Sequence, residues 1–198
     1  MDSTSDSNEL REMFEESRQR IISILDDALL LTQIDVSSDR FQSAPVLLSA
    51  ALNRAVERAT EFAESRGVSI TPLSAGPYLV LADEDLLVRA LQALLETAVK
   101  FSVERETVRL VCELVSDALT VTIESRGKTI PSPAVAKFFD LFSIGNASTP
   151  GRDLGLGPPV AYRILSLFGA SVSVANRDPS GISLNITLKQ GTTPNLGG

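Results

Sequence analysis

Apolar residues recur along the first part of the chain with the spacing of an α-helix. From residue 10 onward they follow alternating steps of four and three residues, the heptad pattern of helices that pack side by side. A second apolar row makes this stripe too wide for a helix that stands alone in water. We predict a helix over residues 9–35 that pairs with a second copy of itself; packing onto its own chain is the alternative. The two rows are Leu10, Phe14, Ser17, Ile21, Ile24, Ala28 and Leu31, and Ile22, Leu25 and Leu29.

After a polar linker at residues 36–45, helical spacing and strand-like alternation follow one another. Asp83 precedes a strongly apolar helix and suits its N-cap. The stretch 125–157 is rich in Gly, Pro and Ser, which predicts an irregular region around one short helix. Together these elements predict an α+β fold, a two-layer α/β sandwich. The expected helices cover residues 48–62, 86–98 and 159–169, and the expected strands cover residues 68–73, 78–83, 107–115, 118–125, 171–176 and 181–189.

Composition narrows the class of protein. The chain has 198 residues, of which 43% are apolar and 22% are charged, as in one globular domain with an added element. The net charge of −7 argues against nucleic acid as a partner. The N-terminus has no secretion signal, and the most apolar stretch is interrupted by Asp26 and Asp27 and is too short to cross a bilayer. We therefore expect no membrane insertion and a cytoplasmic location.

The sequence contains no histidine and a single cysteine, Cys112. A Ser-His-Asp triad, a Cys-His dyad and the familiar zinc sites are thereby excluded, and so is phosphorylation of this chain on its own histidine. Cys112 lies in an alternating apolar run, so we expect a reduced, buried thiol.

Five segments, in order, resemble the core of a sensor histidine kinase, within the superfamily of gyrase, Hsp90, histidine kinases and MutL. Residues 83–102 (DEDLLVRALQALLETAVKFS) are similar to the helix with the asparagine box. The resemblance implies the histidine kinase-like ATPase (Bergerat, or GHKL) fold behind a long N-terminal dimerisation helix. The other segments are residues 18–35, like the end of the dimerisation domain; 41–70, like the first catalytic-domain helix and strand; 138–149, like the phenylalanine box; and 151–176, like the glycine-rich box and the helix and strand after it.

The asparagine box departs from the family pattern at its magnesium-binding position. The family reads Leu-Leu-x-Asn-Ala-x-Lys-Phe, whereas this chain reads LLETAVKF and has Thr97 in place of the asparagine. A threonine hydroxyl is a shorter and poorer ligand for a hard cation than an amide oxygen. Lys100 is retained where the family places a phosphate-facing lysine; a solvated lysine near a helix end is the alternative.

The adenine-binding motif is also altered. The family's Asp-x-Gly-x-Gly-Ile aligns with SRGKTI, which places Ser125 at the aspartate, keeps Gly127 and puts Thr129 at the second glycine. Loss of a charge-assisted hydrogen bond to adenine costs about 1.5–3 kcal/mol. Glu124 cannot replace the aspartate, because neighbouring strand residues point to opposite faces.

The glycine-rich box keeps some glycines and loses its middle one. Gly151, Gly155 and Gly157 match positions that approach the nucleotide phosphates in the family, but Asp153 replaces the middle glycine. Pro158 and Pro159 remove two backbone donors at the start of the following helix. These departures predict an ATP site that binds ATP and magnesium weakly or not at all.

The resemblance implies a bacterial-type two-component signalling protein. We predict a dimeric docking or regulatory module with a degenerate ATP site, a pseudokinase whose partner is a response regulator or a kinase. An active ATP-dependent histidine kinase that phosphorylates a histidine on another chain or a missing segment is the alternative, and a serine kinase of the anti-sigma-factor type is a third. The expected organisation is a disordered N-terminus (1–8), a dimerisation helix and linker (9–40), an ATPase domain (41–190) and a flexible tail (191–198).

Overall fold

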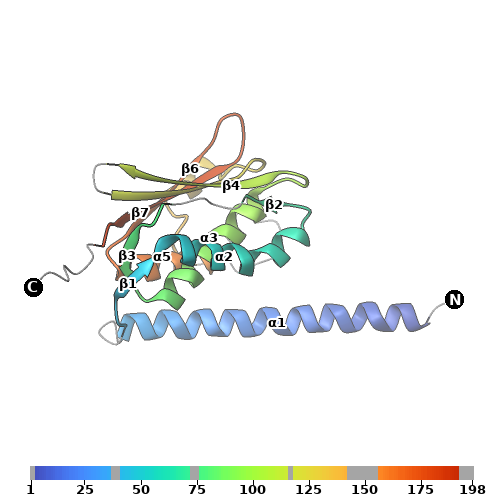
Figure 1. Cartoon of the computed structure of the whole chain (residues 1–198). Coiled ribbons are helices and arrows are strands. Elements are labelled where there is room, and N and C mark those ends of the chain that lie inside the picture. Colours follow the sequence, from blue (N-terminus) through green and yellow to red (C-terminus); the bar gives the residue numbers. More distant parts are fainter. Residues whose placement is uncertain (1–2, 37–40, 72–75, 116–117, 142–155, 192–198) are drawn as a thin grey trace, which may run out of the picture.

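The computed structural model describes residues 3–36, 41–71, 76–115, 118–141 and 156–191. Their helices form a layer against one face of a five-stranded sheet, and a long N-terminal helix runs along the other side of that layer (Figure 1). The elements are α1 (Ser3–Val36), β1 (Ala44–Leu47), α2 (Leu48–Glu64), β2 (Ser69–Ile70), β3 (Leu79–Ala82), α3 (Glu84–Phe101), β4 (Thr107–Val115), β5 (Ala118–Glu124), α4 (Ser132–Val135), α5 (Gly157–Leu167), β6 (Ser171–Asn176) and β7 (Ile182–Lys189).

The large sheet has the strand order β2-β4-β5-β7-β6. β5 and β7 occupy its centre, and their alternate residues are buried against the helices, as Leu119, Val121 and Ile123 show on β5. Their partners Leu188, Ile186 and Leu184 on β7 are buried as well. This alternation confirms the predicted two-layer α+β sandwich.

One strand was missing from the expectation. β1 begins at the end of the predicted linker and pairs antiparallel with β3, so that Pro45 faces Leu81 in a separate two-stranded sheet. Four residues that include a proline carry too short a pattern to indicate a strand. β1 forms because its partner arrives more than thirty residues later along the chain.

Cys112 is half-buried rather than buried, because β4 lies near the edge of the sheet. Burial raises the pKa of its thiol, and the charge of Glu113 adds to this effect. The thiol is therefore the favoured form at neutral pH.

Among the residues whose side chains the structure describes, those of α1 that are buried against the rest of the chain lie in its C-terminal third. Leu30 and Ile34 are buried, and Asp27 and Asp35 pair with Arg89 of α3 at 2.8 Å and Arg163 of α5 at 3.0 Å. The helix begins at Ser3, six residues before the predicted start, and its N-terminal part extends past the body (Figure 1). Packing onto the same chain thus explains the apolar residues in the last turns of α1, but not those nearer its N-terminus.

Most of the remaining apolar stripe on α1 faces solvent, although Ile24 and Leu31 are half-buried. Leu10, Phe14, Ile21 and Leu29 keep 70%, 71%, 59% and 60% of their surface exposed. Monomeric proteins rarely leave such a continuous apolar row uncovered. In the described part of the chain, no helix is long and apolar enough to cross a membrane.

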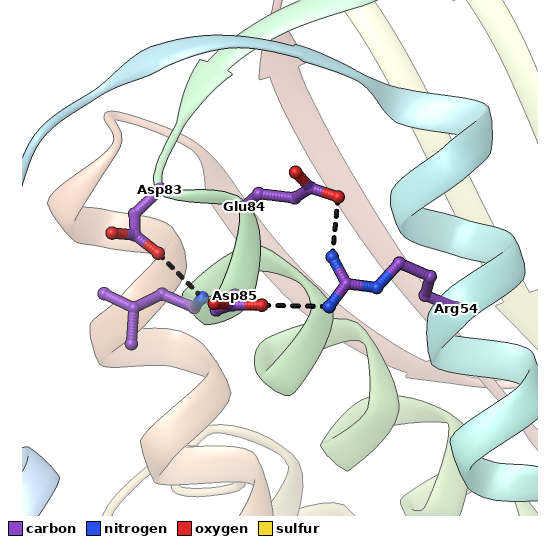
Figure 2. A network of polar contacts seen from close by, with 5 residues as sticks. Arg54, Asp83, Glu84 and Asp85 are labelled. Atoms are coloured by element: carbon purple, nitrogen blue, oxygen red, sulfur yellow. Dashed lines mark hydrogen bonds and ion pairs between the residues drawn. The ribbon is translucent and has the colours of Figure 1, made fainter.

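The start of α3 is fixed by three polar contacts (Figure 2). Asp83 is its N-cap as predicted, since the carboxylate accepts a hydrogen bond from the Leu86 N–H at 3.1 Å. Arg54 of α2 donates to Glu84 at 2.6 Å and to Asp85 at 2.9 Å. The hydrogen bond to Glu84, and to a lesser extent that to Asp85, raises the pKa of Arg54. Together they tie the first turn of α3 to α2.

We expect Asp83→Ala to lower the free energy of unfolding by about 0.5–2 kcal/mol, because the Leu86 N–H loses its acceptor. Asp85→Ala is the matched control: Asp85 is exposed, and its loss leaves Arg54 paired with Glu84, so the cost is at most about 1 kcal/mol. Urea unfolding followed by circular dichroism measures both. Equal losses in the two variants would contradict the capping role of Asp83.

Candidate nucleotide site

The predicted site residues that the structure describes converge on the C-terminal half of α3. The segment after β5 is bonded to the end of this helix, where the Lys128 N–H donates to the Phe101 carbonyl at 2.8 Å and the Val103 N–H to the Arg126 carbonyl at 3.1 Å. On the other side, a β-carbon placed on Gly157 would lie 3.7 Å from Thr97 Oγ1. The fold therefore brings together the asparagine-box helix, the end of β5 and the start of α5. Gly151, Asp153 and Gly155 lie outside the described residues.

Thr97 is turned into the protein. Its side chain is 3% exposed, and its hydroxyl donates to the Ala93 carbonyl one turn earlier at 2.7 Å. A buried hydroxyl needs such a partner, and a residue inside a helix finds it most readily four positions back. The position that the family uses for magnesium thus presents an oxygen that is already engaged within the helix.

Lys100 lies beside α2. Its Nζ is 5.6 Å from the centre of the Phe62 ring, close enough for a cation–π contact. The guanidinium of Arg66 lies over the same ring at 4.8 Å. The contact of Lys100 with α2 was predicted neither for a phosphate-facing lysine nor for a solvated one.

Ser125 is fully buried at the end of β5. Its N–H donates to the Ile182 carbonyl at 2.9 Å, and the Ile182 N–H donates to Ser125 Oγ at 3.4 Å. Glu124 points away and pairs with Arg177 at 3.1 Å, which agrees with the prediction that Glu124 cannot replace the family's aspartate. Ser125 therefore helps to join β5 to β7.

Gly127 lies against the end of α3. Its φ is +147°, and a β-carbon there would come within 2.6 Å of the Phe101 carbonyl oxygen and 2.7 Å of the Val103 nitrogen. Only glycine fits this close backbone approach. Thr129 is exposed, whereas the next residue, Ile130, is buried and is held by two hydrogen bonds with the Asn176 side chain at 2.7 and 2.8 Å.

Aromatic rings connect the short α4 region to both neighbouring helices. Phe101 of α3 contacts Phe138 with ring centres 6.1 Å apart, Phe138 contacts Phe139 at 5.1 Å, and Phe139 stacks on Tyr162 of α5 at 5.7 Å. The sequence indicated the Phe-Phe pair but not Tyr162, whose stacking depends on where α5 packs. These rings connect the segment after α4 to α3 and α5.

The start of α5 is built from buried residues. Pro158 and Pro159 are both buried in its first turn. Neither has an N–H, so the turn lacks two of the donors with which a helix N-terminus binds phosphate. Among the residues that the structure describes, no group of three or more His, Cys, Asp or Glu side chains could hold a metal ion.

Residues 82–192 match the family described as histidine kinase-, DNA gyrase B-, and HSP90-like ATPase. The chain belongs to this family. Members bind ATP, usually with magnesium, and the matched region includes every predicted site residue.

Curated relatives are sensor proteins. VanSC of Enterococcus gallinarum is 25% identical over 189 residues, which cover 92% of this chain and 52% of that protein. KdpD of Escherichia coli is 28% identical over 118 residues, or 60% of this chain and 13% of that protein. The chain thus spans about half or less of these relatives. It contains a histidine kinase-type ATPase domain of two-component sensor proteins.

Solved structures share the fold over nearly the whole chain. Full-length ShkA, crystallised in complex with AMPPNP, has a TM-score of 0.75 at 22% identity and is matched by 98% of this chain over 41% of its own. The Acinetobacter baumannii histidine kinase AdeS has a TM-score of 0.70 at 17% identity, with 97% and 87% covered. The histidine kinase core expected from the sequence is confirmed.

We expect Gly127→Ala to lower the free energy of unfolding by about 2–4 kcal/mol, because the new methyl group meets backbone atoms that cannot move independently. Gly169→Ala is the control: its φ is also positive, at +69°, but no atom lies within 4 Å of the added carbon. Gly169→Ala should lower the free energy of unfolding only by the cost of the new backbone strain, about 1–2 kcal/mol. Thermal and urea unfolding compare the two, and equal losses would show that the contact with α3 is not tight.

Proposed function

We propose that this chain is a histidine kinase-like core whose ATP site is degenerate and which acts as a dimeric docking or regulatory module in two-component signalling. The observation that carries the proposal is the engagement of Thr97, whose hydroxyl is buried and bonded to its own helix. Ser125 supports it, because its backbone and hydroxyl both bond to Ile182. Two positions that select magnesium and adenine in the family serve internal packing here.

The residues that the structure describes do not suit magnesium-bound ATP. A hard cation prefers carboxylate, carbonyl or amide oxygens, and the Thr97 hydroxyl is neither charged nor directed outward. The N–H of a nucleotide's adenine amino group seeks a charged acceptor, and Ser125 offers at best a neutral hydroxyl that already accepts from Ile182. We therefore derive no phosphoryl-transfer step through this site.

The second candidate is an active ATP-dependent histidine kinase that phosphorylates a histidine on another chain. Its support is the family itself and the AMPPNP complex of ShkA, which shares the fold. Calorimetry with Mg-ATP separates the two functions. Binding tighter than about 100 μM would favour the kinase, whereas the absence of heat up to millimolar nucleotide would favour the docking module.

The partners follow from the uncovered stripe of α1 and from the class of relatives. Sensor histidine kinases dimerise and pair with response regulators. The exposed row that contains Leu10, Phe14 and Ile21 can pack in a symmetric helical bundle, and we assign the homodimer to residues 9–35. A response regulator or a partner kinase would then dock on the dimer.

Restoring the family residues should recover nucleotide affinity in steps. Ser125→Asp should give the first gain, because it returns the charged acceptor for adenine, and Thr97→Asn should add an increment that requires magnesium. Asp153→Gly should help least alone, since Pro158 and Pro159 still withhold amide donors. Calorimetry with and without magnesium measures each step. A folded triple variant that binds no ATP at millimolar concentration would show that the pocket has been reshaped.

The double variant Ile21→Glu and Ile24→Glu should convert the dimer to a monomer, because four carboxylates would have to be desolvated in the symmetric seam. Light scattering and sedimentation measure the mass. Ser23→Glu with Gln33→Glu is the matched control, since it adds the same charge at exposed polar positions of α1. If the mass of the Ile21 and Ile24 variant equals that of the control, the helix is not the interface.

A further inference from the structure

The two edges of the large sheet are built differently. At one edge, β2 covers only the beginning of β4, with pairs at residues 69–70 and 107–108. The rest of this edge of β4 carries the exposed charged residues Arg109 and Glu113. Charged side chains of this kind keep an edge from pairing with another strand.

The opposite edge, β6, has none of these protections. Its sequence, SVSVAN, contains no charged residue and no proline. All six of its residues pair with β7 in an unbroken antiparallel register, from Ser171 opposite Thr187 to Asn176 opposite Ile182, so there is no bulge. Within the described ranges, no strand pairs with the outer side of β6. Alternate N–H and C=O groups of the strand therefore point away from the sheet.

The two faces of β6 also suit the addition of a strand. Val172 and Val174 lie on the inner face, opposite the buried Ile186 and Leu184, but they are only half-buried themselves. The apolar layer thus remains open at this edge. The outer face carries the small, exposed residues Ser171, Ser173 and Ala175, which would not obstruct a neighbouring strand.

We propose that the outer edge of β6 is a second self-association surface, on which β6 of another copy of this chain pairs antiparallel about a two-fold axis midway between the two Ser173 residues. The axis lies perpendicular to the sheet, so the helical layers of both copies lie on the same side. Two five-stranded sheets would join into one continuous sheet of a size that proteins tolerate. The partner is a second copy because the strand is complementary to itself.

The register shows this self-complementarity. With Ser173 opposite its own copy, Val172 faces Val174 of the other copy and Ser171 faces Ala175. Residues directly opposite in an antiparallel pair share one face of the sheet, so apolar residues meet apolar ones on the helix side and small residues meet small ones outside. A shift by one residue would bring valine opposite serine and reverse the faces.

Charge also favours β6 as the place where two copies touch. Each chain carries a net charge of −7, so two copies repel one another over most of their surfaces. The neutral strand adds no charge to the contact. Because one pair of short strands buries much less than the roughly 1,200 Å² of a stable interface, the association should be weak and should depend on concentration.

Disulfide trapping tests the contact at its axis. In a Cys112→Ala background, Ser173→Cys places two thiols directly opposite one another, at the Cα separation of about 4.5–5.5 Å that a disulfide spans. Mild oxidation should cross-link this variant at least ten times faster than Thr187→Cys, which puts the thiol on the same outer face but one strand inward. Equal rates would overturn the proposal.

Sedimentation of the full chain tests the same contact without a cross-link. In the Ile21→Glu and Ile24→Glu background, where α1 should not associate, the chain should form dimers at high concentration and no larger species. Ser173→Lys should abolish these dimers by placing like charges on the axis, whereas Thr187→Lys should leave them intact. A mass that stays monomeric at all concentrations, or dimers that survive Ser173→Lys, would overturn the edge contact while leaving the proposed function unaffected.

Discussion

The burial of the broad apolar face of α3 is the constraint on which the rest of the molecule depends. The helix packs against α2, α5 and the central strands, and the apolar residues along it from Leu87 to Val99, apart from the half-buried Ala93, are almost completely removed from water. A helix with so broad an apolar face is stable only in such a position, and the narrow stripe with Arg89, Gln92 and Glu96 is the part that stays partly exposed. Everything else is arranged around it: Asp83 and Arg54 hold its start, and the end of β5 closes on its last turn through Gly127.

That constraint explains the chemistry of the site. A polar side chain inside α3 must find its partner within the protein, and Thr97 does so on its own helix. The same packing directs Lys100 toward Phe62 of α2 and encloses Ser125 against Ile182. Thr97 and Ser125, which align with nucleotide-binding positions of the family, both form hydrogen bonds within the domain. The proposed loss of nucleotide binding and these internal contacts would then be two aspects of one change.

Part of α1 contacts the body of its own chain, whereas other surfaces of the molecule are left open to other chains. The C-terminal turns of α1 are held to the body by Leu30, Ile34 and two ion pairs, of which the Asp27–Arg89 pair is the more buried. The N-terminal turns carry the uncovered apolar row, and β6 presents an uncharged strand edge. The docking module that we propose would act through such surfaces.

The sequence by itself determined the class of fold and the positions of most elements. Heptad spacing, strand alternation, the cap at Asp83 and the ordered family motifs are local patterns, so each can be recognised within a short stretch of a single sequence. It also located the altered family positions Thr97 and Ser125. Only the tertiary structure decided where those side chains point, that residues 44–47 form a strand, that Tyr162 stacks on Phe139, and which part of α1 its own body covers. These features depend on partners far apart in the sequence, and a residue's own pattern carries no record of the neighbour that folding brings to it.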